Sequence, residues 1–373
     1  MEPSIGWVIG AGGVVGVVGA GTMGAGIAQL ALENGHQVLL HDVDAAAIER
    51  GRARVREGLA RRAARLDLDA DSIDDWVAGR LTRLRDARTL DAVGAEAQVV
   101  IEAALEDLDL KRTIFRALDA ATGPEVMLAT NTSALLVGSI AALTTRPGRV
   151  LGLHFFNPAP VMALVEVVSA ETTDPFVVER AVALMTAWGK TPVGCSDHPG
   201  FIVNRVNRPF TIEALRMLED ELAPVEAIDG AMRAAGFPLG PFELIDLAGV
   251  DINLAASRSI WDGLGRPDRL RPSPLLERLA AEGRLGRKTG AGFYRYDDAG
   301  HLAVGPEFAR AEAPTRMALD DIRSRIVAAI DAEARLALGE GVATAHDIDL
   351  AMRLGAGHPA GPFERAATPT IDR

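Results

Sequence analysis

The sequence predicts an α/β domain with a doubly wound parallel sheet, followed by an all-helical domain that is partly repeated. Three observations support this fold class. Between residues 14 and 197, short β-branched runs alternate with helical stretches, the pattern of a parallel sheet covered by helices on both faces. After residue 198, the apolar residues recur at helical spacing. Residues 347–367 then repeat a stretch that begins at Ala227.

The overall composition is that of an ordinary globular protein, with 48% hydrophobic and 24% charged residues in 373. Its formal charge of −12 argues against nucleic acid or an anionic membrane as a general partner. A single cysteine, Cys195, cannot form an internal disulfide, and no apolar run is long enough to span a bilayer. The N-terminus also lacks the pattern of a signal peptide. We therefore expect a soluble, cytoplasmic protein.

Two glycine clusters lie near the N-terminus, at Gly10–Gly13 and Gly19–Gly24. The second follows a β-branched run, Val14–Val18, and precedes a helical stretch, Ala25–Asn34, that stops at Gly35. It matches GxGxxG, in which glycines let backbone N–H groups approach a pyrophosphate at a helix N-terminus. The predicted cofactor-binding residues of this turn are Gly19, Gly21, Thr22, Met23 and Gly24. The first cluster runs into a strand instead, so residues 1–13 are expected to be a leader outside a Rossmann-type domain at 14–197.

Asp42 ends the next strand-like run, QVLLHD, 18 residues beyond Gly24. An acidic residue at this position accepts hydrogen bonds from the adenosine ribose and repels a 2′-phosphate. The sequence therefore predicts NAD rather than NADP as the cofactor.

Further strand-like runs at 97–104 and 126–130 flank a predicted helix at 107–121. Ligands of doubly wound sheets bind outside the carboxyl ends of the strands. This edge would hold Glu106, Lys111 and the turn Asn131–Ser133. Each of these residues, taken alone, fits a solvated loop or a helix cap equally well.

An arginine-rich stretch, Glu49–Arg65, carries seven arginines against two glutamates in an otherwise acidic protein. Four recur at helical spacing opposite an apolar side formed by Val55, Leu59 and Leu66; they are Arg50, Arg54, Arg61 and Arg65. A solvated helix face is one explanation. The other is a binding surface for a phosphorylated substrate, with Arg54 and Arg61 as candidates, because guanidinium groups match phosphate oxygens.

The stretch Val150–Ser169 contains two strand-like runs that flank the prolines of Asn157–Pro160. If the chain reverses symmetrically about Pro160, residues whose numbers sum to 320 face each other, which pairs His154 with Glu166. A carboxylate on one imidazole nitrogen orients the ring, so that histidine can act as a general base. A structural core histidine is the alternative. No cluster has the spacing of a metal site, and Cys195 is expected to be an inert packing residue.

The second half of the chain begins with a predicted helical segment from Asp197 to Glu219, which contains Asn204. We place a helical domain at 198–297, including a glycine-rich basic loop with Lys288, a linker at 298–318 and a partial duplicate at 319–367. Three positions recur 120 residues later: Ile202, Arg205 and Glu213 match Ile322, Arg325 and Glu333. Asn204 becomes Ser324, so the second copy is expected to be structural.

Taken together, these motifs resemble the L-3-hydroxyacyl-CoA dehydrogenase family. They are VGAGTMGAGIAQ, IEAALEDLDLKR, NTSAL, GLHFFNPAPVMALVEVV, PGFIVNR, LGPFEL and GRKTGAGFY. The similarity covers residues 14–296 and recurs over 319–367. Some longer family members act on 3-hydroxybutyryl-CoA or 3-hydroxyadipyl-CoA. Two features depart from the family pattern, namely the glycine-rich leader and a short joining segment.

The resemblance implies a role for several residues. His154 would be the general base and Glu166 its partner, while Ser133 and Asn204 would bind the reacting oxygens of the substrate. Asn157 would lie near the nicotinamide, and Glu106, Lys111 and Lys288 match positions that contact NAD. The family also holds the CoA nucleotide at the arginine-rich helix.

The expected reaction is NAD-dependent oxidation of (S)-3-hydroxyacyl-CoA to 3-oxoacyl-CoA. The alternatives are a dehydrogenase of a free hydroxy acid or sugar acid, and a non-catalytic NAD-binding protein. We expect either a homodimer or a monomer in which the second copy packs on the first as an internal pseudo-partner. Arg208, one turn beyond Asn204, is a candidate for binding a terminal carboxylate, although a surface position is expected for it.

Overall fold

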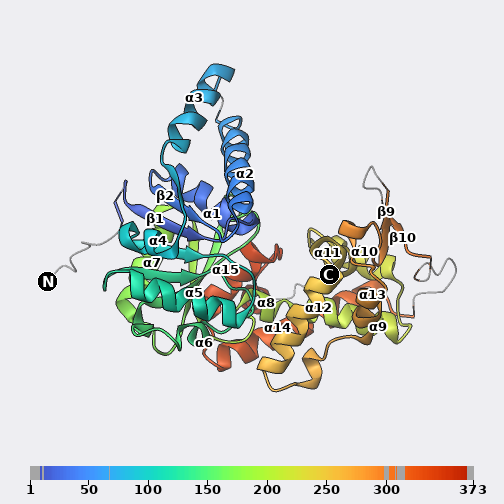
Figure 1. The fold of residues 1–373 in the computed structure, drawn as a ribbon. Helices are drawn as coiled ribbons and strands as arrows, with labels where there is room; N and C mark the ends of the chain where they lie inside the picture. Colours follow the sequence, from blue (N-terminus) through green and yellow to red (C-terminus); the bar gives the residue numbers. More distant parts are fainter. Residues whose placement is uncertain are drawn as a thin grey trace. The chain divides into compact units, whose positions relative to one another are not determined.

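A computed structural model describes residues 9–10, 12–66, 68–297, 302–306, 308 and 316–367. The chain divides into two compact units, at 1–197 (unit 1) and 198–373 (unit 2) (Figure 1). Within the described residues, no helix is both long and apolar enough to cross a membrane.

Unit 1 is an α/β unit whose strands and helices alternate along most of its length. The strands are β1 Val14–Val18, β2 Gln37–His41, β3 Leu84–Ala87, β4 Val99–Glu102, β5 Met127–Thr130, β6 Val150–Phe155, β7 Leu164–Ser169 and β8 Thr191–Ser196. The helices are α1 Thr22–Glu33, α2 Ala45–Ala63, α3 Ala70–Leu81, α4 Leu90–Glu96, α5 Leu108–Ala121, α6 Val137–Ala141, η1 Pro147–Arg149 and α7 Pro175–Ala187.

The eight strands form one sheet in the order β3-β2-β1-β4-β5-β6-β7-β8. The first six in this order are parallel, which confirms the predicted doubly wound sheet. β7 runs antiparallel to β6, and β8 is parallel to β7. The central strands are nearly continuous runs of buried residues because helices cover both faces of the sheet. This arrangement brings the carboxyl ends of β1, β4 and β5 to one edge.

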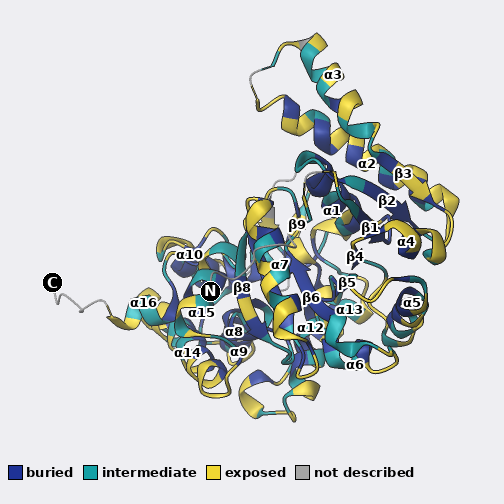
Figure 2. Ribbon diagram, turned by 90° about the vertical axis from the view of Figure 1, so that its left-hand side faces the viewer, coloured by how far each residue is buried: buried dark blue, intermediate teal, exposed yellow. Residues whose placement is uncertain are grey.

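The arginine-rich stretch forms α2, which packs on α1 and, together with α3, extends away from the sheet of unit 1 (Figures 1 and 2). Val55 and Leu59 are fully buried, as expected for its apolar side. Leu66 is an exception to that expectation, since it follows the end of the helix and is 38% exposed. Arg54 and Arg61 are exposed.

Unit 2 is mainly helical. Its helices are α8 Val203–Val206, α9 Arg208–Glu219, α10 Val225–Ala234, α11 Pro241–Ala248, α12 Val250–Gly263, η2 Asp268–Leu270, α13 Pro274–Ala281, η3 Arg287–Thr289, α14 Leu319–Gly339, α15 Ala345–Gly355 and α16 Pro362–Ala367. Two short strands, β9 Tyr294–Tyr296 and β10 Leu302–Val304, form an antiparallel pair.

The predicted helical segment from Asp197 to Glu219 is divided between α8 and α9 at Asn207. Pro209 explains the division, because a proline has no N–H to continue the helical hydrogen bonds and is favoured in the first turn of a new helix. The expected linker at 298–318 contains β10. Its Phe308 is buried, and the ring centroids of Phe308 and Phe293 lie 5.1 Å apart. Several other residues of that segment lie outside the described ranges.

The two copies in unit 2 share the same local architecture. In the first copy, the Asp229 carboxylate accepts hydrogen bonds from the backbone N–H groups of Phe242 and Glu243 at the start of α11. In the second copy, Asp349 does the same for Phe363 and Glu364 at the start of α16. Helix α14 of the second copy packs against α9 and α10 of the first. The duplication in the sequence is therefore a duplication of structure.

Candidate active site

The glycine turn between β1 and α1 is packed so tightly that two of its glycines admit no side chain. A Cβ atom on Gly24 would lie 1.8 Å from the Gly19 carbonyl oxygen. One on Gly19, whose φ is +102°, would lie 2.5 Å from the Ala103 carbonyl oxygen. At Gly21, by contrast, a Cβ would meet nothing within 4 Å. The backbone at Gly21 is thus open on the side where a pyrophosphate would approach, which fits a dinucleotide.

Asp42 follows β2 and is tied to the same turn. Its Oδ2 accepts a hydrogen bond from the Ala20 N–H at 2.9 Å, and its Oδ1 accepts one from the Asp44 N–H at 3.3 Å. These two bonds hold the carboxylate beside the glycine turn, and its selection of NAD over NADP stays a prediction. In the first glycine cluster, the Gly13 N–H donates to the Gly10 carbonyl at 2.9 Å, and the Gly12 N–H donates to the Gly35 carbonyl at 3.1 Å, which joins the cluster to the end of α1.

A buried ion-pair network connects the ends of β4 and β5. Lys111, 1% exposed, donates to Glu102 Oε1 at 2.7 Å, and its Nζ lies 3.4 Å from Glu106 Oε2. Thr130 Oγ1 donates to the second oxygen of Glu102 at 2.7 Å. Sequence reasoning did not single out Glu102, although an acidic residue at the end of an otherwise apolar strand was a usable signal. Lys111 therefore binds carboxylates inside unit 1, and its contact with NAD stays a prediction.

Glu106 organises the turn that follows β5. Its Oε1 accepts hydrogen bonds from Thr132 Oγ1 at 2.6 Å and from the Ser133 N–H at 2.8 Å. Desolvation raises the pKa of this carboxyl, but the Thr132 hydroxyl, the Lys111 ammonium and the backbone donors outweigh it and hold the pKa below its usual range. Asn131 Oδ1 accepts the Phe155 N–H at 2.9 Å, which joins this turn to the end of β6. The structure thus brings Glu106, Lys111 and Ser133 together.

The predicted hairpin register is confirmed, since His154 of β6 pairs with Glu166 of β7. His154 Nδ1 lies 2.6 Å from Glu166 Oε2. The carboxyl is fully buried and the imidazole is 6% exposed. A carboxylate at this distance fixes a proton on Nδ1 and leaves Nε2 as the nitrogen that can accept one. Asn157 follows β6 and is exposed.

The remaining predicted site residues belong to unit 2. Asn204 is half-buried on α8. Lys288, in η3, donates to both carboxylate oxygens of Asp251 at 2.6 and 2.7 Å. Arg208 is the first residue of α9 and is 8% exposed, so the expectation of a surface arginine is wrong. Neighbouring helices bury it, and its position along one helix could not indicate this.

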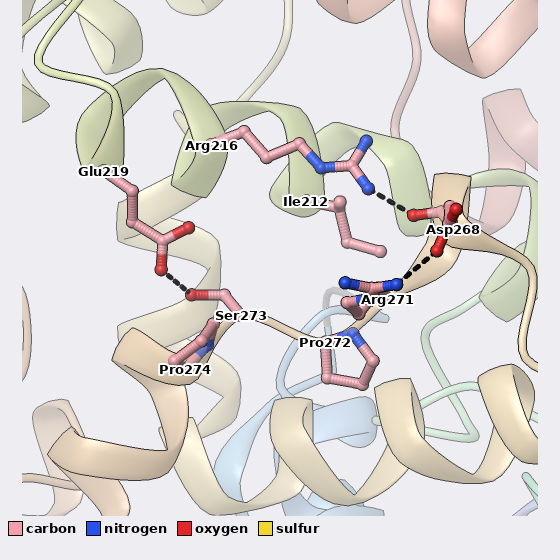
Figure 3. Close-up of a pocket in the computed structure, with 8 residues that line it drawn as sticks. All are labelled: Ile212, Arg216, Glu219, Asp268, Arg271, Pro272, Ser273 and Pro274. Carbon is pink, nitrogen blue, oxygen red and sulfur yellow. Dashed lines mark hydrogen bonds and ion pairs between the residues drawn. The ribbon is translucent and has the colours of Figure 1, made fainter.

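A surface hollow of about 310 Å³ lies on unit 2 between α9 and the segment leading into α13 (Figure 3). It is lined by Ile212, Arg216, Glu219, Asp268, Arg271, Pro272, Ser273 and Pro274. Its polar side chains bond to one another: Ser273 donates to Glu219 at 2.6 Å, and Arg216 donates to the Asp268 carbonyl at 2.6 Å. None of the predicted site residues lines this hollow. Among the described residues, no group of three or more His, Cys, Asp or Glu could hold a metal ion.

The sheet order, the glycine turn and Asp42 define unit 1 as a Rossmann-type dinucleotide-binding domain. Its residues 14–198 match the 3-hydroxyacyl-CoA dehydrogenase NAD binding domain. The C-terminal domain of the same family matches residues 200–296 and 322–373. The chain therefore belongs to the 3-hydroxyacyl-CoA dehydrogenase family, whose cofactor is NAD, and it is an enzyme of that class.

Three similar proteins illustrate the match. A 3-hydroxyadipyl-CoA dehydrogenase of Escherichia coli K12 is 46% identical over 294 residues, which are 79% of this chain and 61% of that protein. The human mitochondrial hydroxyacyl-coenzyme A dehydrogenase is 41% identical over 75% of this chain and 90% of its own length. The crystal structure of a 3-hydroxybutyryl-CoA dehydrogenase from E. coli K12 superposes with a TM-score of 0.82 at 37% identity, covering 95% of this chain and 91% of that one.

Proposed function

We propose that this chain oxidises (S)-3-hydroxyacyl-CoA to 3-oxoacyl-CoA, with His154 as the general base and Glu166 as its partner. The observation that carries the proposal is the buried 2.6 Å contact between His154 Nδ1 and Glu166 on adjacent strands. The names of the relatives indicate short acyl chains, such as 3-hydroxybutyryl or 3-hydroxyadipyl.

The oxidation removes a proton from the 3-hydroxyl group and a hydride from the carbon that bears it. Bound NAD supplies the hydride acceptor, and the open backbone at Gly21 together with Asp42 would hold its dinucleotide. His154 takes the hydroxyl proton at Nε2, because its Nδ1 is engaged with Glu166. The carboxylate stabilises the imidazolium that results. By family resemblance, Ser133 and Asn204 orient the reacting oxygens, and Asn157 lies toward the nicotinamide.

The arginines of α2 support a CoA ester rather than a free acid as substrate. Arg54 and Arg61 are exposed on a helix that extends from the sheet of unit 1, and Arg61 lies 3.7 Å from Glu57 in a weak surface pair. Such cations are available to phosphate oxygens at little cost. A free hydroxy acid has no phosphate groups to which these arginines could bind.

The test is NADH formation by the wild type and by His154→Ala, with 3-hydroxybutyryl-CoA, 3-hydroxyadipyl-CoA and free 3-hydroxybutyrate. We expect turnover of at least one CoA ester, and a loss of about 10²- to 10⁴-fold in the variant. Turnover of the free acid alone would favour the second candidate, a free-acid dehydrogenase. An absence of turnover with every substrate, while NAD still binds, would favour a non-catalytic protein.

The proposal extends to the oligomeric state: the second copy serves as an internal partner for the first, and the chain is a monomer. The packing of α14 on α9 and α10 supports this, because a second protein molecule would have to displace α14 to reach the same face. Light scattering across a range of protein concentrations should give the mass of one chain. A dimer at all concentrations would contradict the proposal.

A further inference from the structure

Arg208 is a buried cation without an anionic partner. Its Nη1 donates to Ser257 Oγ at 3.4 Å, which is a long hydrogen bond, and its buried Nε has no hydrogen-bond partner among the described residues. Within those residues, no carboxylate lies within ion-pair distance of the guanidinium. Burial lowers the pKa of Arg208 to about 10.

The face of α12 toward Arg208 carries a second unsatisfied group. Ser257 is 1% exposed, and Asn253, one turn earlier on the same helix, is 8% exposed. Asn253 Oδ1 also has no hydrogen-bond donor among the described residues. A half-turn of this amide about its side-chain bond would present its NH₂ group in place of the oxygen. Arg208, Ser257 and Asn253 thus provide hydrogen-bonding capacity that their neighbours do not use.

The other buried arginine nearby shows what a structural ion pair looks like in the same unit. Arg205 is fully buried and donates to Glu333 at 2.8 Å and to Glu340 at 2.7 and 2.9 Å. Its positive charge is fully compensated. An uncompensated charge at similar burial is costly, and such groups concentrate at binding sites, where the missing partner is the ligand.

We propose that Arg208, with Ser257 and Asn253, binds the terminal carboxylate of a dicarboxylic acyl chain, so that the preferred substrate is an ω-carboxy-3-hydroxyacyl-CoA. This rests on the proposed function, in which Asn204 contacts the reacting oxygen. Asn204 of α8 and Arg208 of α9 are four residues apart, and Asn207 between the two helices keeps a helical backbone conformation (φ −81°, ψ −8°), so about one turn, roughly 6 Å, separates them. In a six-carbon diacid, three carbon–carbon bonds of about 1.5 Å each separate the hydroxyl-bearing carbon from the far carboxyl carbon, a distance that the arginine side chain can accommodate.

The sequence of the second copy agrees with a ligand role that only the first copy keeps. At the offset of 120 residues, Asn204 corresponds to Ser324 and Arg208 to Ala328. The structural pair Arg205 and Glu213, in contrast, is retained as Arg325 and Glu333. The residues proposed to bind the acyl chain differ between the copies, whereas the residues that join the copies do not.

The decisive comparison uses two CoA esters of equal chain length, 3-hydroxyadipyl-CoA and 3-hydroxyhexanoyl-CoA, which differ by a terminal carboxylate in place of a methyl group. For the wild type, we expect kcat/KM to be about 100-fold higher with 3-hydroxyadipyl-CoA. This ratio corresponds to the free energy of one hydrogen-bonded contact between charged groups. Equal kcat/KM values for the two compounds, or a higher value for 3-hydroxyhexanoyl-CoA, would overturn the proposal without any variant. If neither ester were oxidised, the proposed function itself would fail.

Two variants locate the effect. Arg208→Met should lower kcat/KM for the diacid ester about 100-fold and change that for the hexanoyl ester by less than about threefold. Arg208→Lys should retain part of the preference for the diacid ester, because lysine keeps the positive charge but lacks the planar pair of N–H donors of a guanidinium group. The control is Arg323→Met, an exposed arginine of the second copy, which should leave both values unchanged. Equal losses on both esters in Arg208→Met would mean that Arg208 is only structural.

Discussion

Arg205 of the first copy donates through Nε to Glu333 of the second copy at 2.8 Å. The equivalent residues are joined in the opposite sense, since Arg325 of the second copy donates through Nε to Glu213 of the first at 2.8 Å. Each arginine therefore bonds to the counterpart of its own copy's glutamate. Two exchanged pairs of this kind arise when two copies face each other across an approximate two-fold axis.

The same relationship holds at the turns between the helices. A Cβ on Gly236 would lie 3.2 Å from Pro359 of the second copy, and one on Gly357, its counterpart, would lie 3.0 Å from Pro238 of the first. Phe237 and its counterpart His358 contact each other edge to face, with ring centroids 4.8 Å apart. These contacts support the proposal of an internal partner.

The two exchanged ion pairs should differ in their contribution to stability, because they differ in burial. Arg205→Met would remove one of the two arginines that bond to the deeply buried Glu333 and leave Arg269 as its partner, so we expect it to lower the free energy of unfolding by roughly 2–3 kcal/mol. Arg325 is 33% exposed, and its Glu213 also bonds to Arg216, so Arg325→Met should cost about 1 kcal/mol or less. Urea unfolding followed by circular dichroism gives both values. Equal costs would contradict this reasoning.

His358 should make unit 2 sensitive to acid. Burial, followed by the positive charge of Arg365, lowers the pKa of His358 to about 3. The unfolded chain therefore binds more protons than the folded chain between pH 3 and 6.5, and stability falls as the pH falls through that window. This histidine alone should remove about 2 kcal/mol between pH 7 and pH 5.

The variant His358→Phe places at this position the residue that its first-copy counterpart has. It loses the hydrogen bond to Asn207 Oδ1, and so a constant amount of stability at every pH. Its free energy of unfolding should nevertheless fall less between pH 7 and pH 5 than that of the wild type. Parallel pH curves for the two proteins would show that His358 titrates normally.

Gly21 and Gly24 should respond differently to alanine. Gly24→Ala places a methyl group 1.8 Å from a carbonyl oxygen and should disrupt the turn, which will lower the melting temperature. Gly21→Ala meets no protein atom and should leave the melting temperature unchanged while weakening NAD binding by about tenfold or more. Calorimetric titration with NAD and a thermal melt separate the two effects.

The matched control for this pair is Gly10→Ala in the first glycine cluster. A Cβ there also meets nothing within 4 Å, so the substitution is as mild as that at Gly21. Both the melting temperature and the affinity for NAD should be unchanged. A loss of NAD affinity in Gly10→Ala would assign part of the cofactor site to the leader.

Asp42→Ala should reduce the preference for NAD over NADP by about 100-fold in kcat/KM, because the carboxylate that repels a 2′-phosphate is removed. Asp44, two residues later, caps α2 by accepting the Ala46 N–H at 3.0 Å, and it serves as the control. Asp44→Ala should cost stability of about 1 kcal/mol and leave the cofactor preference unchanged. An unchanged preference in Asp42→Ala would remove Asp42 from the cofactor site.

Glu166→Gln should lower kcat by about 10²- to 10⁴-fold, because a neutral amide no longer fixes the histidine tautomer or stabilises the imidazolium that forms. The affinity for NAD should be unchanged, because the pair is part of the sheet rather than of the glycine turn. Cys195 lies on the neighbouring strand β8 and is buried, so Cys195→Ala tests whether any change near this hairpin has the same effect. We expect that variant to retain the wild-type kcat.

Much of unit 1 could be predicted from sequence because its signals are local. The GxGxxG turn, the strand before it and the helix after it are adjacent in the chain, and the register of His154 and Glu166 follows from a reversal only 12 residues long. The duplication could likewise be recognised, since it needs only a comparison of the chain with itself at a fixed offset. The ends of elements were less certain, as the division at Asn207 shows.

The sequence by itself determined the fold class, the cofactor and the pairing within the hairpin, since these depend on patterns of neighbouring residues. Only the tertiary structure decided which buried charges have partners. Arg205 and Arg208 lie three residues apart and look alike in the sequence, yet one bonds to two glutamates from more than 120 residues away and the other to a single serine. Burial and through-space pairing are set by how distant helices pack, and no local pattern encodes that packing.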